Sequence, residues 1–419
     1  MKLKNYFLLF IFAITFTGLN AQTIKVLFDA TKAQTAGNAD WQVDANTFNL
    51  GPNSSGAMVT GSGNEANPQR YPTPAQSGIT STTSETFWKG GLSAWGVECA
   101  KLGYLVETLP YNGQITYGST TNAQDLSLYK VFVICEPNIL YTTAQKQAIV
   151  QFVQNGGGLF IIADHTVSDR NNDGKDSPVI LNDLMNNNGL ATNPFGFTFD
   201  LANFSQTTTN FNVLATDPVL HGPKGNPTQM KFSNGTSMTM NPTANSSVKG
   251  LVYKTGSAKG NSNVMMVHSH YGNGKVVGLG DSSCPDDGTG DTNDGLYNGW
   301  TVDAAGDHRR IILNATIWLT TTTASPYREG INQDNVSPTN ELMVFPNPSS
   351  SELFLRMSEG FQNGTSISIL DLTGRIVRTI VVDNSSEIIQ MNIDELQSGY
   401  YFVSVYDGNN VVTKRFVKE

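Results

Sequence analysis

Acidic and histidine side chains follow two apolar runs of this chain, at points where strands of a sheet would end. The run Leu159–Ala163 is followed by Asp164 and His165, and the run Lys275–Leu279 is followed closely by Asp281. Such side chains can serve as general acid and base, or they can hold a metal through carboxylate oxygens and an imidazole nitrogen. The sequence therefore predicts that Asp164, His165 and Asp281 form one catalytic site, with both chemistries open.

A separate cation site is predicted in the loop Asp169–Asp176, whose sequence DRNNDGKD has the D-x-N-x-D-G spacing of a calcium loop. Alternate residues of such a loop turn their oxygens inward, and Gly174 permits the sharp turn. An EF-hand would carry Glu where this chain has Ile180, so the loop is not an EF-hand. An Asx-turn loop that binds no ion is the alternative. The predicted calcium ligands are Asp169, Asn171, Asp173 and Asp176.

Three further groups of residues bear on function. The acidic segment Asp286–Gly295 follows Asp281 and fits either a loop that binds metal or sugar hydroxyls or a solvated loop. His268 and His270 lie near the turn of a predicted hairpin, about 20 Å along the partner strand from Asp281, so a structural role is expected. Aromatic residues that could stack on sugar rings are Trp41, Tyr71, Trp88, Tyr297 and Trp300.

The elements that must position these residues follow from apolar periodicity. Continuous apolar runs that alternate with amphipathic helices are typical of a parallel sheet covered on both faces. The sequence therefore predicts an α/β fold with a doubly wound, mostly parallel sheet, in which ligands bind beyond the carboxyl ends of the strands. Predicted strands are Ile24–Asp29, Leu105–Leu109, Val131–Cys135, Leu159–Ala163, Asn263–His270 and Lys275–Asp281. Predicted helices are Glu85–Leu102 with Ser84 as N-cap, a helix that begins at Thr142 or Thr143, Val179–Met185 and Asp307–Leu319.

Composition limits the classes of partner. The chain has 419 residues, which suits two domains, and its net charge of −9 argues against nucleic acid as a partner because phosphate binding needs a basic face. Its three cysteines, Cys99, Cys135 and Cys284, form neither a disulfide framework nor a zinc site. Cys135 lies inside an apolar run and is expected to be a buried, inert thiol.

The first residues of the chain have the pattern of a signal peptide. Lys2 and Lys4 precede the apolar run Tyr6–Thr17, which is too short to span a bilayer, and Ala21 before Gln22 is a plausible cleavage point. No other segment is apolar enough for a transmembrane helix. The predicted organisation is a signal peptide at 1–21, an α/β domain at 22–320, a linker at 321–339 and a β-sandwich at 340–419.

The C-terminal segment resembles the type A sorting domain of the type IX secretion system. The motifs that carry the resemblance are Phe345-Pro346-Asn347-Pro348, Ile369-Leu370-Asp371-Leu372-Thr373-Gly374-Arg375, Leu396-Gln397-Ser398-Gly399-Tyr400-Tyr401 and the closing strand Val412–Lys418. The resemblance implies export by the type IX machinery of a Gram-negative bacterium, through the periplasm to the surface or the medium, with removal of the tag.

The central domain resembles the class I glutamine amidotransferase-like superfamily, including its trehalose-utilisation-like branches. The resemblance rests on the order of elements, on Asp217-Pro218-Val219-Leu220-His221-Gly222, and on Tyr271-Gly272-Asn273-Gly274-Lys275-Val276-Val277 before Gly280-Asp281. Amidotransferases carry a nucleophilic Cys just after the strand equivalent to Leu159–Ala163. This chain has Asp164 and His165 there, so glutamine hydrolysis by a cysteine is not implied.

Together these features predict a secreted hydrolase that acts on an extracellular polymer, with carbohydrate the favoured class. Hydrolysis with and without the help of a metal ion are both open. The alternative is a non-catalytic, secreted or surface-bound protein that uses the same rim to capture glycans. A hydrolase needs titratable groups that converge in one place, whereas a binding protein needs a shallow aromatic groove.

Overall fold

The computed structural model describes residues 23–35, 39–44, 50–52, 58–60, 76–290, 297–321, 342–345, 347–371, 375–406 and 411–419. The chain divides into two compact units, Met1–Pro326 and Tyr327–Glu419. The predicted signal peptide and nearly all of the predicted linker lie outside the described residues.

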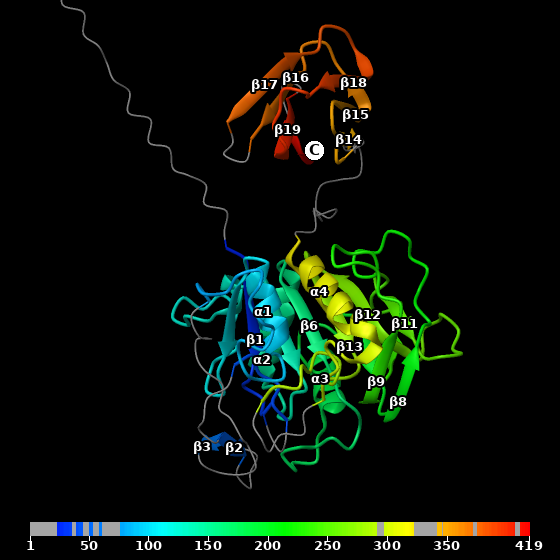
Figure 1. Cartoon of the computed structure of the whole chain (residues 1–419). Helices are drawn as coiled ribbons and strands as arrows, with labels where there is room; N and C mark the ends of the chain where they lie inside the picture. Colours follow the sequence, from blue (N-terminus) through cyan, green and yellow to red (C-terminus); the bar gives the residue numbers. More distant parts are fainter. Residues whose placement is uncertain are drawn as a thin grey trace, which may run out of the picture. The chain divides into compact units, whose positions relative to one another are not determined.

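The first unit is built on a nine-stranded sheet in the order β4-β1-β5-β6-β13-β12-β10-β7, with β11 paired to β12 (Figure 1). The first five strands of that order are mutually parallel: β4 (Leu105–Leu109), β1 (Lys25–Asp29), β5 (Val131–Cys135), β6 (Gly158–Ile162) and β13 (Gly274–Leu279). The other four are antiparallel to their neighbours: β12 (Val264–Tyr271), β10 (Met238–Met240), β7 (Phe197–Phe199) and β11 (Lys249–Tyr253). The sheet is thus mixed, and its parallel half carries the predicted site.

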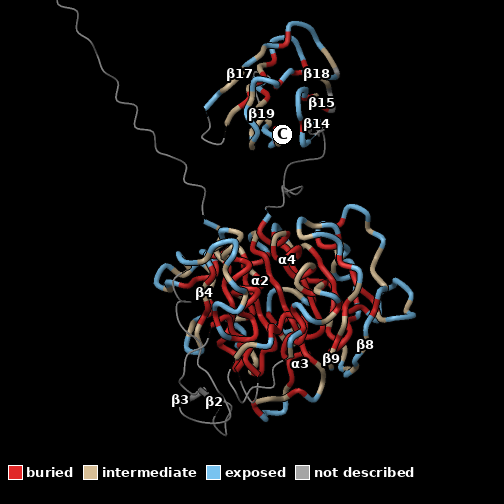
Figure 2. Tube along the Cα trace, viewed as in Figure 1, coloured by how far each residue is buried: buried red, intermediate tan, exposed pale blue. Residues whose placement is uncertain are grey.

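Alternate residues of the parallel strands enter two different hydrophobic cores. On β5, Val131 and Val133 belong to the core that also contains α1 (Ser93–Lys101) and α4 (Asp307–Thr320). The intervening Phe132 and Ile134 belong to the core that contains α2 (Thr143–Gln154) and α3 (Ser177–Asn186). Helices therefore cover both faces, the doubly wound arrangement that continuous apolar strands predict, and the buried interior is evident in Figure 2.

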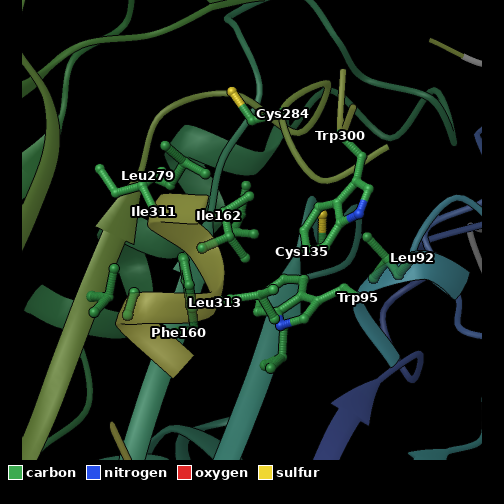
Figure 3. Packing of buried hydrophobic residues seen from close by; sticks show 14 of the residues in the cluster. Leu92, Trp95, Cys135, Phe160, Ile162, Leu279, Cys284, Trp300, Ile311 and Leu313 are labelled. Carbon is green, nitrogen blue, oxygen red and sulfur yellow. The ribbon is translucent and has the colours of Figure 1, made fainter. Parts of the chain in front are cut away.

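Aromatic packing holds the first of these cores together (Figure 3). The indole of Trp95 on α1 meets the ring of Phe160 edge-on, with centroids 5.0 Å apart, and the ring of Phe28 in the same manner at 5.3 Å. Its Nε1 donates to Thr316 Oγ1 on α4 at 3.0 Å, so the one polar atom of this buried side chain has a partner.

The predicted helix Glu85–Leu102 is wrong in its first half, because α1 begins only at Ser93. Gly90 and Gly91 lie against the backbone of residues 40–42, where a Cβ on Gly90 would stand 2.3 Å from the carbonyl oxygen of Gln42. Ser84 Oγ accepts from Thr86 N in a local turn instead of capping the helix. The first turn of α1 is capped from far away, since Ala94 N donates to Asp287 Oδ2 at 2.6 Å.

The other predicted helices and strands are confirmed to within a few residues. Helix α2 starts with a capping box in which the side chains of Thr142 and Gln145 each bind the other's backbone N–H. Short elements fill the remainder of the unit: β2 (Leu50–Pro52), β3 (Met58–Thr60), η1 (Leu126–Leu128), β8 (Phe204–Thr208), β9 (Met230–Gly235) and η2 (Asp303–Gly306).

The second unit is the predicted β-sandwich, with a core of its own. One sheet contains β14 (Leu342–Phe345), β15 (Glu352–Phe361) and β18 (Ser386–Asn392). The other contains β17 (Ile376–Val381), β16 (Ser366–Leu370), β19 (Gly399–Tyr406) and β20 (Val411–Lys418).

Candidate functional site

Four neighbouring parallel strands, β1, β5, β6 and β13, are each followed or ended by a buried carboxylate: Asp29, Glu136, Asp164 and Asp281. We call this edge of the sheet the acidic rim. Asp29 has a structural role there. Its Oδ1 accepts from the backbone N–H and hydroxyl of Thr31, and its Oδ2 accepts from Gln34 Nε2 and the Tyr141 hydroxyl. Each carboxylate oxygen of Asp29 therefore accepts two hydrogen bonds.

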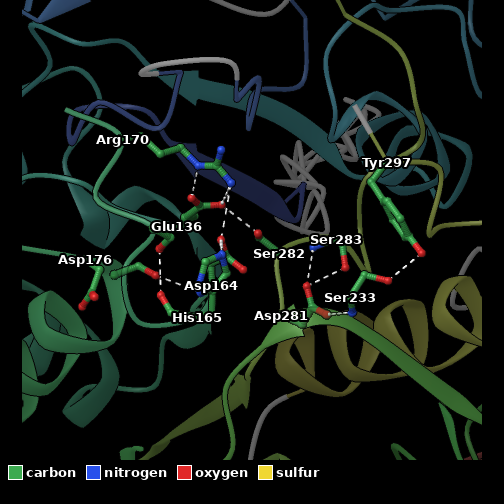
Figure 4. Close-up of polar contacts among 12 residues, drawn as sticks. Glu136, Asp164, His165, Arg170, Asp176, Ser233, Asp281, Ser282, Ser283 and Tyr297 are labelled. Atoms are coloured by element: carbon green, nitrogen blue, oxygen red, sulfur yellow. Dashed lines mark hydrogen bonds and ion pairs between the residues drawn. The ribbon is translucent and has the colours of Figure 1, made fainter. Parts of the chain in front are cut away.

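Glu136 and Asp164 share one guanidinium (Figure 4). Arg170 forms an ion pair with Glu136, and its Nη2 lies 3.4 Å from Asp164 Oδ2. Ser282 Oγ donates to Glu136 Oε2 at 2.7 Å and so joins the segment after β13 to the end of β5. A single cation thus serves two buried carboxylates.

Two non-glycine residues beside this cluster have a left-handed backbone. Glu136 has φ +42° and Val167 has φ +69°. Such conformations cost on the order of 1–3 kcal/mol each and persist where the surroundings enforce them, often at functional sites. Val167 N donates to Asp176 Oδ2 at 2.7 Å, which is one contact that holds this turn in place.

His165 is the half-buried member of the predicted site. Its Nε2 lies 3.6 Å from Asp164 Oδ2, and its Nδ1 lies 2.6 Å from the carbonyl oxygen of Thr166. Asn203 Nδ2 also lies 2.9 Å from Nδ1, so this nitrogen faces both a carbonyl acceptor and an amide donor. The structure therefore brings Asp164 and His165 together.

Asp281 links the segment after β13 to β9 by hydrogen bonds, and its charge acts on Asp164. Its Oδ1 accepts from the backbone N–H and hydroxyl of Ser283, and its Oδ2 accepts from the backbone N–H of Ser233 on β9. Its charge contributes to the raised pKa of Asp164. Because both oxygens already have donors, a direct reaction at Asp281 stays a prediction.

The rim favours protonated carboxyl groups. Burial, followed by the charges of Glu136 and Asp281, raises the pKa of Asp164 well above its usual range against the opposing effect of Arg170. Burial also raises the pKa of Asp281 to about 7 and that of Asp286 to about 8. The same causes act on the thiol of Cys135, whose pKa is raised well above normal, so this cysteine is inert as predicted. All three cysteines are free and buried, including Cys284, which the sequence places in a polar segment.

Several rim residues escape prediction from sequence. Arg170 lies within the predicted calcium loop, which also contains Lys175, and nothing in the spacing of the loop marks Arg170 as the partner of Glu136 and Asp164. Asp286 and Asp287 are buried instead of lining an open loop, and their oxygens accept backbone N–H groups of Gly288, Tyr297, Ala94 and Thr289. Residues 291–296 of the predicted acidic segment lie outside the described residues.

The histidines of β12 are structural, as predicted. His270 pairs with Lys275 in the hairpin register, and His268 Nε2 lies 2.6 Å from Asp217 Oδ2. His268 also packs on Trp318, with ring centroids 4.6 Å apart. Both histidines belong to the end of β13 opposite the rim.

The predicted calcium loop is closed by its own backbone. The two carboxylate oxygens of Asp169 accept from Asp173 N at 3.1 Å and Gly174 N at 2.6 Å, and Gly174 has φ +84°. Asn171 donates its Nδ2 to the carbonyl oxygen of Asn138 at 2.7 Å. Asp176 is buried, and its Oδ1 has no hydrogen-bond partner among the described residues. The loop is thus folded in the manner that its glycine predicts, while calcium binding stays a prediction.

Calcium is expected to raise the melting temperature of the protein. An ion that binds only the folded state stabilises it by an amount that grows with its concentration over its dissociation constant, about 2.7 kcal/mol at a hundredfold excess. Differential scanning fluorimetry in millimolar calcium and in chelator measures the shift. Asp173→Asn should remove most of it, whereas Asp200→Asn, outside the loop, should keep it. Equal melting temperatures in calcium and chelator would refute the site.

Residues 343–419 match the model of the secretion system C-terminal sorting domain. This segment is a sorting domain. The protein is accordingly exported by the type IX secretion system to the cell surface or the extracellular space. Among the described residues, no helix has both the length and the apolar character needed to cross a membrane.

Solved structures offer only distant similarity. The N-terminal domain of mmIFT52 is 11% identical, with 71% of this chain and 98% of that chain covered and a TM-score of 0.40. A cytoplasmic protein of Salmonella typhimurium is 15% identical, with 70% and 98% covered and a TM-score of 0.34. A ThuA-like protein of Parabacteroides merdae is 11% identical, with 54% and 83% covered and a TM-score of 0.27. No curated protein matches the sequence.

The secreted form is expected to lack both ends of the chain. Removal of the signal peptide should leave Gln22 at or near the N-terminus, and removal of the sorting domain should end the chain within or near 321–339. Intact-mass measurement of protein from the medium and the cell surface tests this. A soluble secreted species that extends to Glu419 would contradict removal of the tag.

Proposed function

We propose that the α/β unit is a hydrolase of an extracellular polymer, with carbohydrate the favoured class, and that Asp164 and His165 perform the proton transfers. The observation that carries this proposal is the excess of buried carboxylates over cations at the rim. Glu136, Asp164, Asp281 and Asp286 are all buried, and Arg170 is the cation that contacts the first two. Buried groups with strongly shifted pKa values concentrate at catalytic sites.

The two residues can take complementary roles in proton transfer. Burial and the nearby carboxylates raise the pKa of Asp164 and so favour the carboxylic acid, which can donate to the leaving oxygen. In the tautomer whose Nδ1–H donates to Thr166, His165 Nε2 is the ring atom that can accept a proton from the attacking water. Transfer from His165 back to Asp164 across the 3.6 Å between Nε2 and Oδ2 restores the starting state.

This route needs no metal ion at the rim. The guanidinium of Arg170 stands between Glu136 and Asp164, in the position where a cation would bridge them. Among the described residues, no group of three His, Cys, Asp or Glu side chains is arranged to hold a metal. Metal-assisted hydrolysis stays a prediction, and its test is activity after exhaustive chelation.

The glycan-binding alternative has less support. It requires exposed aromatic residues, but of the five that the sequence offers, Trp41, Trp88 and Trp300 are buried and Tyr297 is half-buried. The fifth, Tyr71, lies outside the described residues. A panel of neutral, acidic and acylated polysaccharides, assayed for new reducing ends and released acid, separates the two functions. Turnover that Asp164→Asn abolishes supports the hydrolase. Polysaccharide binding by both forms without turnover supports the alternative.

A further inference from the structure

A phenol is held by two donors next to the acidic rim. The hydroxyl oxygen of Tyr297 accepts from Ser233 Oγ at 2.5 Å (Figure 4). It also accepts from Lys231 Nζ at 2.7 Å. Lys231 and Ser233 are alternate residues of β9, so they project from the same side of that strand, while Phe232 between them is buried. Lys231 is also paired with Asp303 at 2.9 Å.

The position of Tyr297 is fixed at both ends. Its backbone N–H donates to Asp286 Oδ2 at 2.6 Å, and Asp286 is fully buried. The backbone N–H of Ser233 donates to Asp281, so the group is joined directly to the rim. The tyrosine itself is half-buried, in contrast to the buried carboxylates behind it.

The arrangement leaves one atom of the phenol available. A phenolic oxygen has two lone pairs and one proton. With Lys231 and Ser233 as the donors, the O–H of Tyr297 is left for a third partner. A cation and a hydroxyl also stabilise negative charge on that oxygen when the proton is shared with an acceptor.

We propose that Tyr297 is a third catalytic residue of the rim, and that Lys231 and Ser233 position it to donate a hydrogen bond to a substrate oxygen that gains negative charge. This inference deepens the proposed function and rests on it for the nature of the reaction. The substrate class it implies carries an ester, acetal or hydroxyl oxygen at that position. A cationic group would meet Lys231 and be rejected.

The reactivity of the phenol can be measured without a substrate. Benzenesulfonyl fluoride reacts with tyrosine through attack of the phenolic oxygen on sulfur, loss of fluoride and release of the phenolic proton to the buffer. In the full-length protein, peptide mass spectrometry should show Tyr297 labelled faster than the exposed Tyr111, Tyr400 and Tyr406. The expected advantage is about tenfold, the size of one charge-assisted hydrogen bond.

Variants assign that reactivity to the contacts. Lys231→Met should reduce labelling of Tyr297 by about tenfold, and Lys231→Arg should restore part of it. Lys254→Met is the matched control, since its ammonium lies over Phe204, and it should leave labelling unchanged. The proposal is overturned if Tyr297 reacts no faster than Tyr111. It is also overturned if Lys231→Met leaves the labelling rate of Tyr297 and the melting temperature of the protein unchanged.

The outcome is separable from the fate of the proposed function. In the polysaccharide assay, Tyr297→Phe should lower kcat about a hundredfold, with a smaller change in KM, because the bond forms chiefly in the transition state. If labelling fails while Asp164→Asn still abolishes turnover, the role of Tyr297 falls and the hydrolase stands. If Tyr297 is reactive but no polymer is hydrolysed, the proposed hydrolase activity is refuted, and the proposal that Lys231 and Ser233 activate Tyr297 is retained.

Discussion

Asp164→Asn is expected to lower the rate of polymer hydrolysis by about two to four orders of magnitude, the usual contribution of a general acid. The substitution keeps the shape of the side chain and the backbone bond from Asp164 N to Ser177 Oγ, but it removes the transferable proton. Stability should be unchanged. Burial and the charge of Glu136 already favour the neutral carboxyl group, so a neutral amide changes the charge of the site little.

Matched variants separate catalysis from folding. His165→Ala should reduce the rate to a similar extent, whereas Asp183→Asn, which removes the partner of Lys146 on α3, should leave the rate unchanged. Asp281→Asn should behave differently and destabilise the fold by about 1–3 kcal/mol, because an amide nitrogen would face the N–H of Ser233 or Ser283. Reducing-end assays and urea denaturation provide both readouts. Full activity of Asp164→Asn would remove the proposed mechanism.

Stability is expected to fall as the pH rises from 6.5 to 7.5. Asp281 and Asp286, with pKa values of about 7 and about 8, hold protons in the folded state that they lose in the unfolded chain, where the ordinary value is 3.8. The folded protein therefore binds more protons in this window, and the free energy of unfolding decreases with pH, by on the order of 1–2 kcal/mol per pH unit. Urea denaturation followed by tryptophan fluorescence in chelator measures the slope.

Other titratable groups limit the pH range in which this decrease is expected. His270 and His308, with pKa values lowered to about 4 by burial, contribute with the opposite sign below pH 6.5, and Lys275, lowered to about 8, does so at and above pH 8. Asp164, whose pKa is also raised, acts in the same direction. Asp286→Asn should therefore remove part of the slope between pH 6.5 and 7.5. Asp287→Asn should leave it, because the pKa of Asp287 is about 6. A flat or rising profile in the wild type would show that these carboxylates are ionised in the folded state.

Local signals predicted the sheet and most of its helices. Strands β4 and β5 are recognisable from their runs of apolar residues. The residues that cap α2 lie within four positions of each other, from Thr142 to Gln145. The order of acidic residues at strand ends could be predicted for the same reason, since parallel neighbours present their carboxyl ends at one edge.

Contacts between distant segments could not be predicted. The start of α1 depends on the backbone at 40–42 and on Asp287, which lies 193 residues beyond Ala94. Arg170 reaches the rim from a loop whose spacing indicates calcium. The partners of Tyr297 come from β9, more than sixty positions earlier. None of these pairings has a periodicity, so a single sequence offers no signal for them.

The placement of β13 has a consequence for how the chain leaves the cell. It lies between β6 and β12, yet it is translated more than a hundred residues after β6. The position between β6 and β12 therefore stays unfilled until the chain has been made up to residue 279. A shorter chain cannot complete the hydrophobic core. Pairings of such long sequence separation form slowly. This topology therefore delays folding until nearly the whole α/β unit is available, in a protein that is exported by the type IX secretion system.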